Sequence, residues 1–145
     1  MKQRIEIDDW LTREELARVR NAVQRAEQRT SGEIRVHLDV AIMEDVLDHA
    51  AFVFRDLGMD KTREHNGVLL YVSVPGHKVA VVGDTGIHAR LGNNYWHGVL
   101  DVVLAHFRED RFCEGLCEGV RLLGEKLEEH FPHRHDDRNE LSNEV

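Results

Sequence analysis

Three short polar clusters carry the side chains best suited to chemistry: Ser31-Gly32-Glu33, Asn66-Gly67 and Gly83-Asp84-Thr85-Gly86. Each cluster stands where a predicted strand begins or ends. If the first two strands run parallel and the third returns as a hairpin, all three clusters fall at one edge of the sheet. The sequence therefore predicts a functional site at that edge.

The three clusters share oxygen-bearing side chains, which are ligands for a divalent cation. Calcium and magnesium take several oxygen ligands, and these come from separate segments of a chain. The predicted metal ligands are Glu33, Asp60, Asn66 and Asp84, with Asp60 supplied by the loop before the second strand. Arg63 in the same loop is placed to hold a substrate phosphate or a ligand carboxylate by charge-assisted hydrogen bonds.

Each cluster also has a purely structural interpretation. Ser31-Gly32 is typical of a turn, Asn66-Gly67 suits a positive backbone dihedral angle, and Asp84 suits the cap of a short helix over residues 87–91. The case for a site therefore depends on the three clusters meeting. No spacing matches an EF-hand loop, so the sequence leaves the metal unassigned between calcium and magnesium.

Motifs for other chemistries are absent from the sequence. The ten histidines are scattered without an HExxH pair, Ser31 lacks a GxSxG elbow, and residues 83–86 lack the lysine and glycine spacing of a phosphate loop. Cys113 and Cys117 lie four apart in a predicted helix, which indicates free thiols instead of a disulfide. The sequence identifies no catalytic residue.

Helical and strand patterns alternate along the first part of the chain. A capping box of Thr12 and Glu15 starts a helix, and period-two alternation over residues 33–40 predicts a strand with one polar face. A helix is expected over residues 44–57. The nearly continuous apolar run 67–74 predicts a buried central strand, and Pro75-Gly76 then turns the chain into an antiparallel strand over residues 78–83.

Two further helices are expected over residues 94–107, capped by Asn93 or Asn94, and over residues 111–131. Glycines at positions 115, 119 and 124 of the last helix suggest close helix packing. Strands interleaved with helices predict an α/β fold, a three-layer α/β/α sandwich with a small mixed central sheet. Residues 1–131 are expected to form a single domain, followed by a polar, flexible tail over residues 132–145.

Charge and hydropathy narrow the classes of partner. The net charge of -8, with no segment that concentrates lysine and arginine, argues against a nucleic-acid partner. No apolar run approaches the roughly 20 residues that cross a bilayer, and the first ten residues are too polar for a signal-peptide core. We therefore expect no membrane span and a cytoplasmic location. A protein partner and the oligomeric state stay open.

Three segments resemble a known family: TSGEIRVHLDV, FRDLGMDKTREHNGVLLYVSVPGHKVAVVGDTGI and HFREDRFCEGLCEGVRLLGEKL. They are similar to the TPM-domain family, which includes thylakoid-lumen, photosystem II repair and receptor-associated membrane proteins. The resemblance implies an α/β/α sandwich, and it implies divalent-metal binding and phosphatase-like activity, which have been described for family members. Glu33, Asn66 and Asp84 stand in the matching motifs, whereas Asp60 and Arg63 rest on the geometric argument alone.

Two functions follow as expectations. The first is a binding or regulatory module that holds calcium or magnesium at the acidic edge. The alternative is a metal-dependent, phosphatase-like hydrolase, in which a cation bound by Glu33 and Asp84 polarises a phosphoryl oxygen of a phosphomonoester and activates water. In that alternative, Arg63 orients the substrate.

Overall fold

The computed structural model describes residues 10–40, 45–92, 94 and 96–133 of the chain. In chain order, the helices and strands are α2 (Arg13–Glu27), β1 (Glu33–Asp39), α3 (Val46–Asp56), the 3-10 helix η1 (Met59–Lys61), β2 (Gly67–Ser73), β3 (Lys78–Gly83), α4 (Thr85–Leu91), α5 (His97–Arg108) and α6 (Phe112–His130). Glu44, Asn93 and nearly all of the predicted tail lie outside the described residues.

The sheet has the order β1-β2-β3 within this described part of the chain. β1 and β2 are parallel, with Glu33 opposite Gly67, and β3 is antiparallel to β2, with Gly83 opposite Val68. Every residue of β2 is buried, as the continuous apolar run predicted. The parallel crossover, the hairpin and the mixed sheet of the α/β fold are all confirmed.

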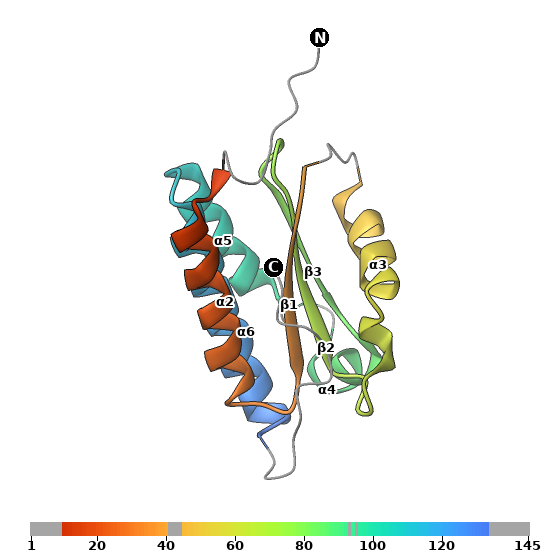
Figure 1. Ribbon diagram of the computed structural model, residues 1–145. Helices are drawn as coiled ribbons and strands as arrows, with labels where there is room; N and C mark the ends of the chain where they lie inside the picture. Colours follow the sequence, from red (N-terminus) through yellow and green to blue (C-terminus); the bar gives the residue numbers. More distant parts are fainter. Residues whose placement is uncertain (1–9, 41–44, 93, 95, 134–145) are drawn as a thin grey trace.

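Helices cover both faces of the sheet (Figure 1): α3 lies on one side, and α2, α5 and α6 lie on the other. Alternate residues of the strands feed two apolar cores. Val68 and Leu70 pack toward α2, α5 and α6, whereas Leu69 and Tyr71 pack toward α3. The period-two geometry of a strand produces this division, because successive side chains point to opposite faces.

The predicted capping box starts α2. Glu15 N donates to Thr12 Oγ1 (3.1 Å), and Thr12 N donates to Glu15 Oε1 (3.0 Å). Helix α5 differs from the prediction, because it begins at His97 instead of Asn94. Trp96, the residue before α5, is buried, and its indole nitrogen lies against Gly83. The regular helix therefore begins only after this buried side chain.

The glycines of α6 permit the close packing that their spacing suggested. A β-carbon on Gly119 would lie 2.6 Å from Val103 Cγ2 on α5, and one on Gly124 would lie 2.8 Å from Ala26 Cβ on α2.

Cys113 is buried and Cys117 half-buried on the same helix, and both are free thiols as predicted. Burial raises the pKa of Cys113 to about 11, so this thiol stays protonated. No helix among the residues placed in the structure has the length and apolar character needed to cross a bilayer.

Candidate functional site

The three polar clusters meet at the end of the sheet where β1 and β2 begin and β3 finishes, here called the Glu33 end. Glu33 N donates to Asn66 O (3.4 Å), and Asp84 N donates to Gly67 O (3.0 Å). Glu33 and Asp84 therefore flank the Asn66-Gly67 pair on its two sides. The predicted convergence of the clusters is confirmed at the level of the backbone.

Asp84 has the structural role that its position suggested. Its carboxylate is buried, and Oδ1 accepts from Thr85 N (2.8 Å) at the start of α4. Its second oxygen lies 3.3 Å from His65 Nδ1. Gly86 N donates to His65 O (2.9 Å), and a β-carbon on Gly86 would lie 2.3 Å from Glu64 O. The loop before β2 is thus pressed against the first turn of α4.

Asn66 lies in a small polar triangle with Ser31 and Glu64. Asn66 Nδ2 donates to Ser31 Oγ (3.3 Å) and to Glu64 Oε2 (3.2 Å), and Ser31 Oγ donates to Glu64 Oε2 (3.2 Å). Glu64 was not predicted from the sequence, because its loop carries several charged residues without periodicity.

The positive dihedral angle suggested for Asn66-Gly67 was wrong, since neither residue has a positive φ. Gly67 is needed instead for close approach, because its β-carbon would lie 2.9 Å from Met59 O.

Glu33 is only 3% exposed, although it begins the polar row predicted for this strand. Its carboxyl pairs with the carboxyl of Glu27 at the end of α2. Glu27 Oε2 accepts from Ile34 N (3.3 Å) on the outer edge of β1. Burial first, then the contact with Glu33, raises the pKa of Glu27 to about 9.

Glu27 Oε1 is buried and receives no hydrogen bond from an N–H or hydroxyl group of the described residues. A proton shared between the carboxyls of Glu27 and Glu33 would satisfy this oxygen. Sequence reasoning missed Glu27, although a signal exists. Glu27 lies four residues after Val23, on the stripe of α2 that faces the core.

The two residues placed by geometric argument alone lie on the surface. Asp60 is exposed in η1, and its side chain makes no hydrogen bond or ion pair with any residue whose position is described. Arg63 is exposed on the loop between η1 and β2. No three His, Cys, Asp or Glu side chains converge as metal ligands in the described ranges. Metal binding by Glu33, Asp60, Asn66 and Asp84 therefore stays a prediction, as does the substrate role of Arg63.

The fold and this sheet end define a TPM domain: the sequence profile of the TPM domain matches residues 7–126. The chain belongs to the TPM-domain family. Among solved structures, it is similar to the NMR structure of the BA42 protein from the psychrophilic bacterium Bizionia argentinensis. The two share 38% sequence identity over 97% of each chain, with a TM-score of 0.88.

A second solved structure shows the fold alone. It is the N-terminal domain of a P. gingivalis protein, also determined by NMR, with 22% identity over 87% of this chain and 83% of that one, and a TM-score of 0.68. No curated protein matches the chain.

Proposed function

We propose that this TPM domain is a binding or regulatory module that holds a divalent cation, calcium or magnesium, at the Glu33 end of the sheet. The supporting observation is the Glu27–Glu33 pair, in which two largely buried carboxyls face each other. Burying two acids together is costly unless a proton or a cation lies between them. A cation in place of the shared proton would let both carboxyls ionise.

The donor chemistry at this end fits a hard cation. Carboxylate, amide and main-chain carbonyl oxygens are all calcium ligands, so a site does not require three acidic side chains. Glu27 and Glu33 would supply the carboxylates, and Asn66 the neighbouring amide and carbonyl groups. Asp84 lies on the far side of Gly67, and exposed Asp60 would join only as an outer ligand.

A cation at this position would tie together segments that are distant in sequence. Glu27 ends α2, Glu33 begins β1, and Asn66 precedes β2. Binding would therefore stiffen the connection between the helical layer and the sheet, which is a route to regulation of a partner-binding surface.

Calorimetric titration with calcium and with magnesium, repeated in buffers of different ionisation enthalpy, tests the proposal. Because the pKa of Glu27 is raised to about 9, cation binding at pH 7 should release about one proton. The Glu33→Gln variant should lose binding. The Glu27→Gln variant should bind more weakly and release no proton.

Asp60→Asn is the matched control, since it removes one exposed carboxylate from the same end without touching the buried pair. It should change the affinity by less than about threefold. Absence of heat and of any shift in melting temperature with either metal would overturn the proposal. Binding without proton release would move the cation away from Glu27.

The alternative function is a metal-dependent phosphatase-like hydrolase, and exposed Arg63 beside this end is the feature that favours it. Its guanidinium would orient the phosphomonoester, with Glu33 and Asp84 holding the metal. Turnover of p-nitrophenyl phosphate should then require added metal and fall sharply in Asp84→Asn, which keeps a side chain able to cap α4. Unchanged turnover in that variant would remove Asp84 from the reaction.

A further inference from the structure

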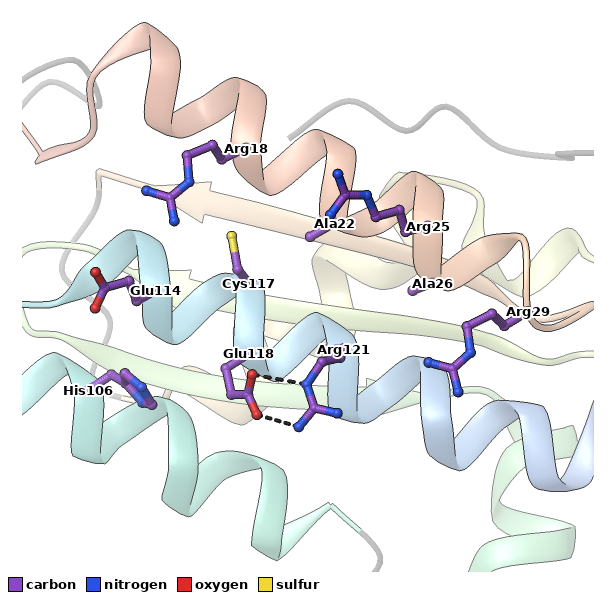
Figure 2. A pocket seen from close by; sticks show the side chains of 10 residues that line it. All are labelled: Arg18, Ala22, Arg25, Ala26, Arg29, His106, Glu114, Cys117, Glu118 and Arg121. Atoms are coloured by element: carbon purple, nitrogen blue, oxygen red, sulfur yellow. Dashed lines mark hydrogen bonds and ion pairs between the residues drawn. The ribbon is translucent and has the colours of Figure 1, made fainter.

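A groove runs between α2 and α6 on the helical layer, away from the α3 face of the sheet. Its volume is about 600 Å³, and Figure 2 shows side chains of both helices lining it. A second hollow of about 370 Å³ adjoins it, since both are lined by Arg18 and Glu114. The residues that line the two hollows extend along α2 from Glu15 to Arg29, which suits a ligand longer than a single small ion.

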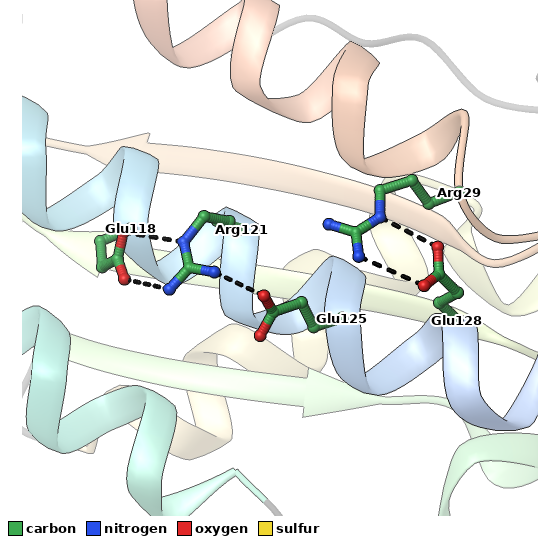
Figure 3. Close-up of polar contacts among 5 residues, drawn as sticks. All are labelled: Arg29, Glu118, Arg121, Glu125 and Glu128. Carbon is green, nitrogen blue, oxygen red and sulfur yellow. Dashed lines mark hydrogen bonds and ion pairs between the residues drawn. The ribbon is translucent and has the colours of Figure 1, made fainter.

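The groove is cationic in a chain whose net charge is -8. Four arginines and two glutamates line it. Arg29 forms a bidentate ion pair with Glu128, and Arg121 pairs with Glu118 and Glu125, as Figure 3 shows. The remaining lining acid, Glu114, pairs with Arg111 outside the groove. The two acids that line the groove itself are therefore already engaged, and the adjoining hollow adds Glu15 and Asp110.

Arg18 and Arg25 carry the charge that is left over. Neither side chain makes a hydrogen bond or ion pair with any residue that the structure describes. They lie seven positions apart on one face of α2, or about 10 Å along the axis. Both side chains extend in the same direction along the helix in Figure 2. A ligand that engages both must carry two anionic groups at a similar spacing.

Small residues form the floor between these arginines. Ala22 and Ala26 come from α2, and half-buried Cys117 comes from α6. Such a floor lets another backbone approach closely. The walls are helices whose backbone groups are already bonded, so an extended peptide would find few partners for its own N–H and C=O groups. A helix satisfies its backbone internally, and a helix lying in a groove is a recurring mode of recognition.

We propose that the α2–α6 groove binds an amphipathic helix of a protein partner, with two acidic residues seven apart that pair with Arg18 and Arg25. Small apolar side chains on the same face of the ligand helix contact Ala22, Ala26 and Cys117. Arg29, four positions beyond Arg25, is available to a third acid if it exchanges its bond to Glu128. This site is independent of the cation proposed at the Glu33 end.

A labelled alanine- and leucine-based peptide of about 18 residues, or five helical turns, tests the proposal by fluorescence anisotropy. It carries glutamates at one position and at seven and eleven positions beyond it, and a scrambled peptide of equal composition and charge is the reference. The patterned peptide should bind the full chain at least about tenfold more tightly than the scrambled one. Binding should also slow the modification of Cys117 by a thiol reagent.

Two double variants of α2 separate the groove from general charge. Arg18→Ala with Arg25→Ala should weaken binding about tenfold, whereas Arg13→Ala with Arg20→Ala, which removes the same charge from exposed positions outside the groove, should not. Arg18→Glu with Arg25→Glu should instead bind a peptide with lysines at the patterned positions.

Equal binding of the scrambled peptide, equal loss in the two alanine pairs, or no binding of the lysine peptide by the charge-reversed chain would each overturn the proposal. Complete displacement of the peptide by millimolar inorganic phosphate would identify a small-anion site and would also overturn it.

Discussion

The two ends of β1 present the same kind of side chain in opposite circumstances. At the far end, Asp39 accepts a hydrogen bond from Tyr71 OH (2.7 Å), and His49 Nε2 lies 3.3 Å away. At the near end, Glu33 faces a second carboxyl, that of Glu27. Both acids lie on the α3-side row of one strand, yet one accepts a hydrogen bond from a hydroxyl and the other meets a second acid. In the proposal above, a proton or a cation lies between the two acids of the second arrangement.

Glu27→Gln, at the Glu33 end, is expected to change the free energy of unfolding the most. The glutamine keeps an acceptor for Ile34 N and adds a donor for Glu33. The pKa of Glu27 is raised to about 9 in the folded state. The stability that its protonated carboxyl contributes is therefore fully present below the unfolded pKa near 4.5 and is lost as pH rises toward 9. The variant should therefore gain unfolding free energy at pH 8 relative to the parent, on the order of a few kcal/mol, and little at pH 4.

Urea unfolding at several pH values measures this difference. Glu118 and Glu128 have lowered pKa values because they bond Arg121 and Arg29, so their stabilisation is lost only as pH falls below the unfolded value. Both ion pairs are present in parent and variant, so their contributions cancel when the two stability profiles are compared. Parallel stability profiles for parent and variant between pH 5 and pH 9 would show that the Glu27–Glu33 pair shares no proton.

Tyr71→Phe should have the next largest effect, at the Asp39 end. Tyr71 is fully buried, and burial raises the pKa of its hydroxyl, so the group acts as a donor throughout the neutral range. Removing a donor to a carboxylate should cost about 2 kcal/mol of unfolding free energy. Thermal and urea unfolding would measure the loss, and the response to calcium should be unchanged. A loss below about 0.5 kcal/mol would mean that His49 or water replaces the hydroxyl.

Substitutions of Asp84 should have a smaller effect. Asp84→Ala should cost about 1 kcal/mol through loss of the α4 cap, whereas Asp84→Asn should cost much less because asparagine also caps helices. Calorimetric melting of the two variants beside the parent would test this order. Equal destabilisation would indicate that the negative charge next to His65, and not the cap, is what α4 requires.

The smallest effect is expected from Asp60→Asn, within about 0.5 kcal/mol of the parent, because the side chain is exposed and has no partner in the described structure. A larger loss of stability, measured by urea unfolding, would mean that the Asp60 carboxylate makes a stabilising contact despite its exposure.

Much of the fold could be predicted because its signals are local. Thr12 and Glu15 lie three positions apart, β2 is continuously apolar, and Pro75-Gly76 leaves too little chain for anything except a hairpin. Those patterns set the direction of each strand and brought Glu33, Asn66 and Asp84 to one end. The helix start at His97 was missed because it depends on Trp96 reaching the core, which no local pattern records.

By itself, the sequence determined the order of the elements, the parallel and antiparallel pairings and the end of the sheet where polar groups gather. Only the tertiary structure decided which groups touch. The end of α2 crosses the outer edge of β1, which places Glu27 against Glu33, and the packing of α2 on α6 leaves Arg18 and Arg25 beside a groove. Periodicity follows from the geometry of a single element, whereas the partner of a buried acid or an exposed arginine depends on the angle at which two elements meet.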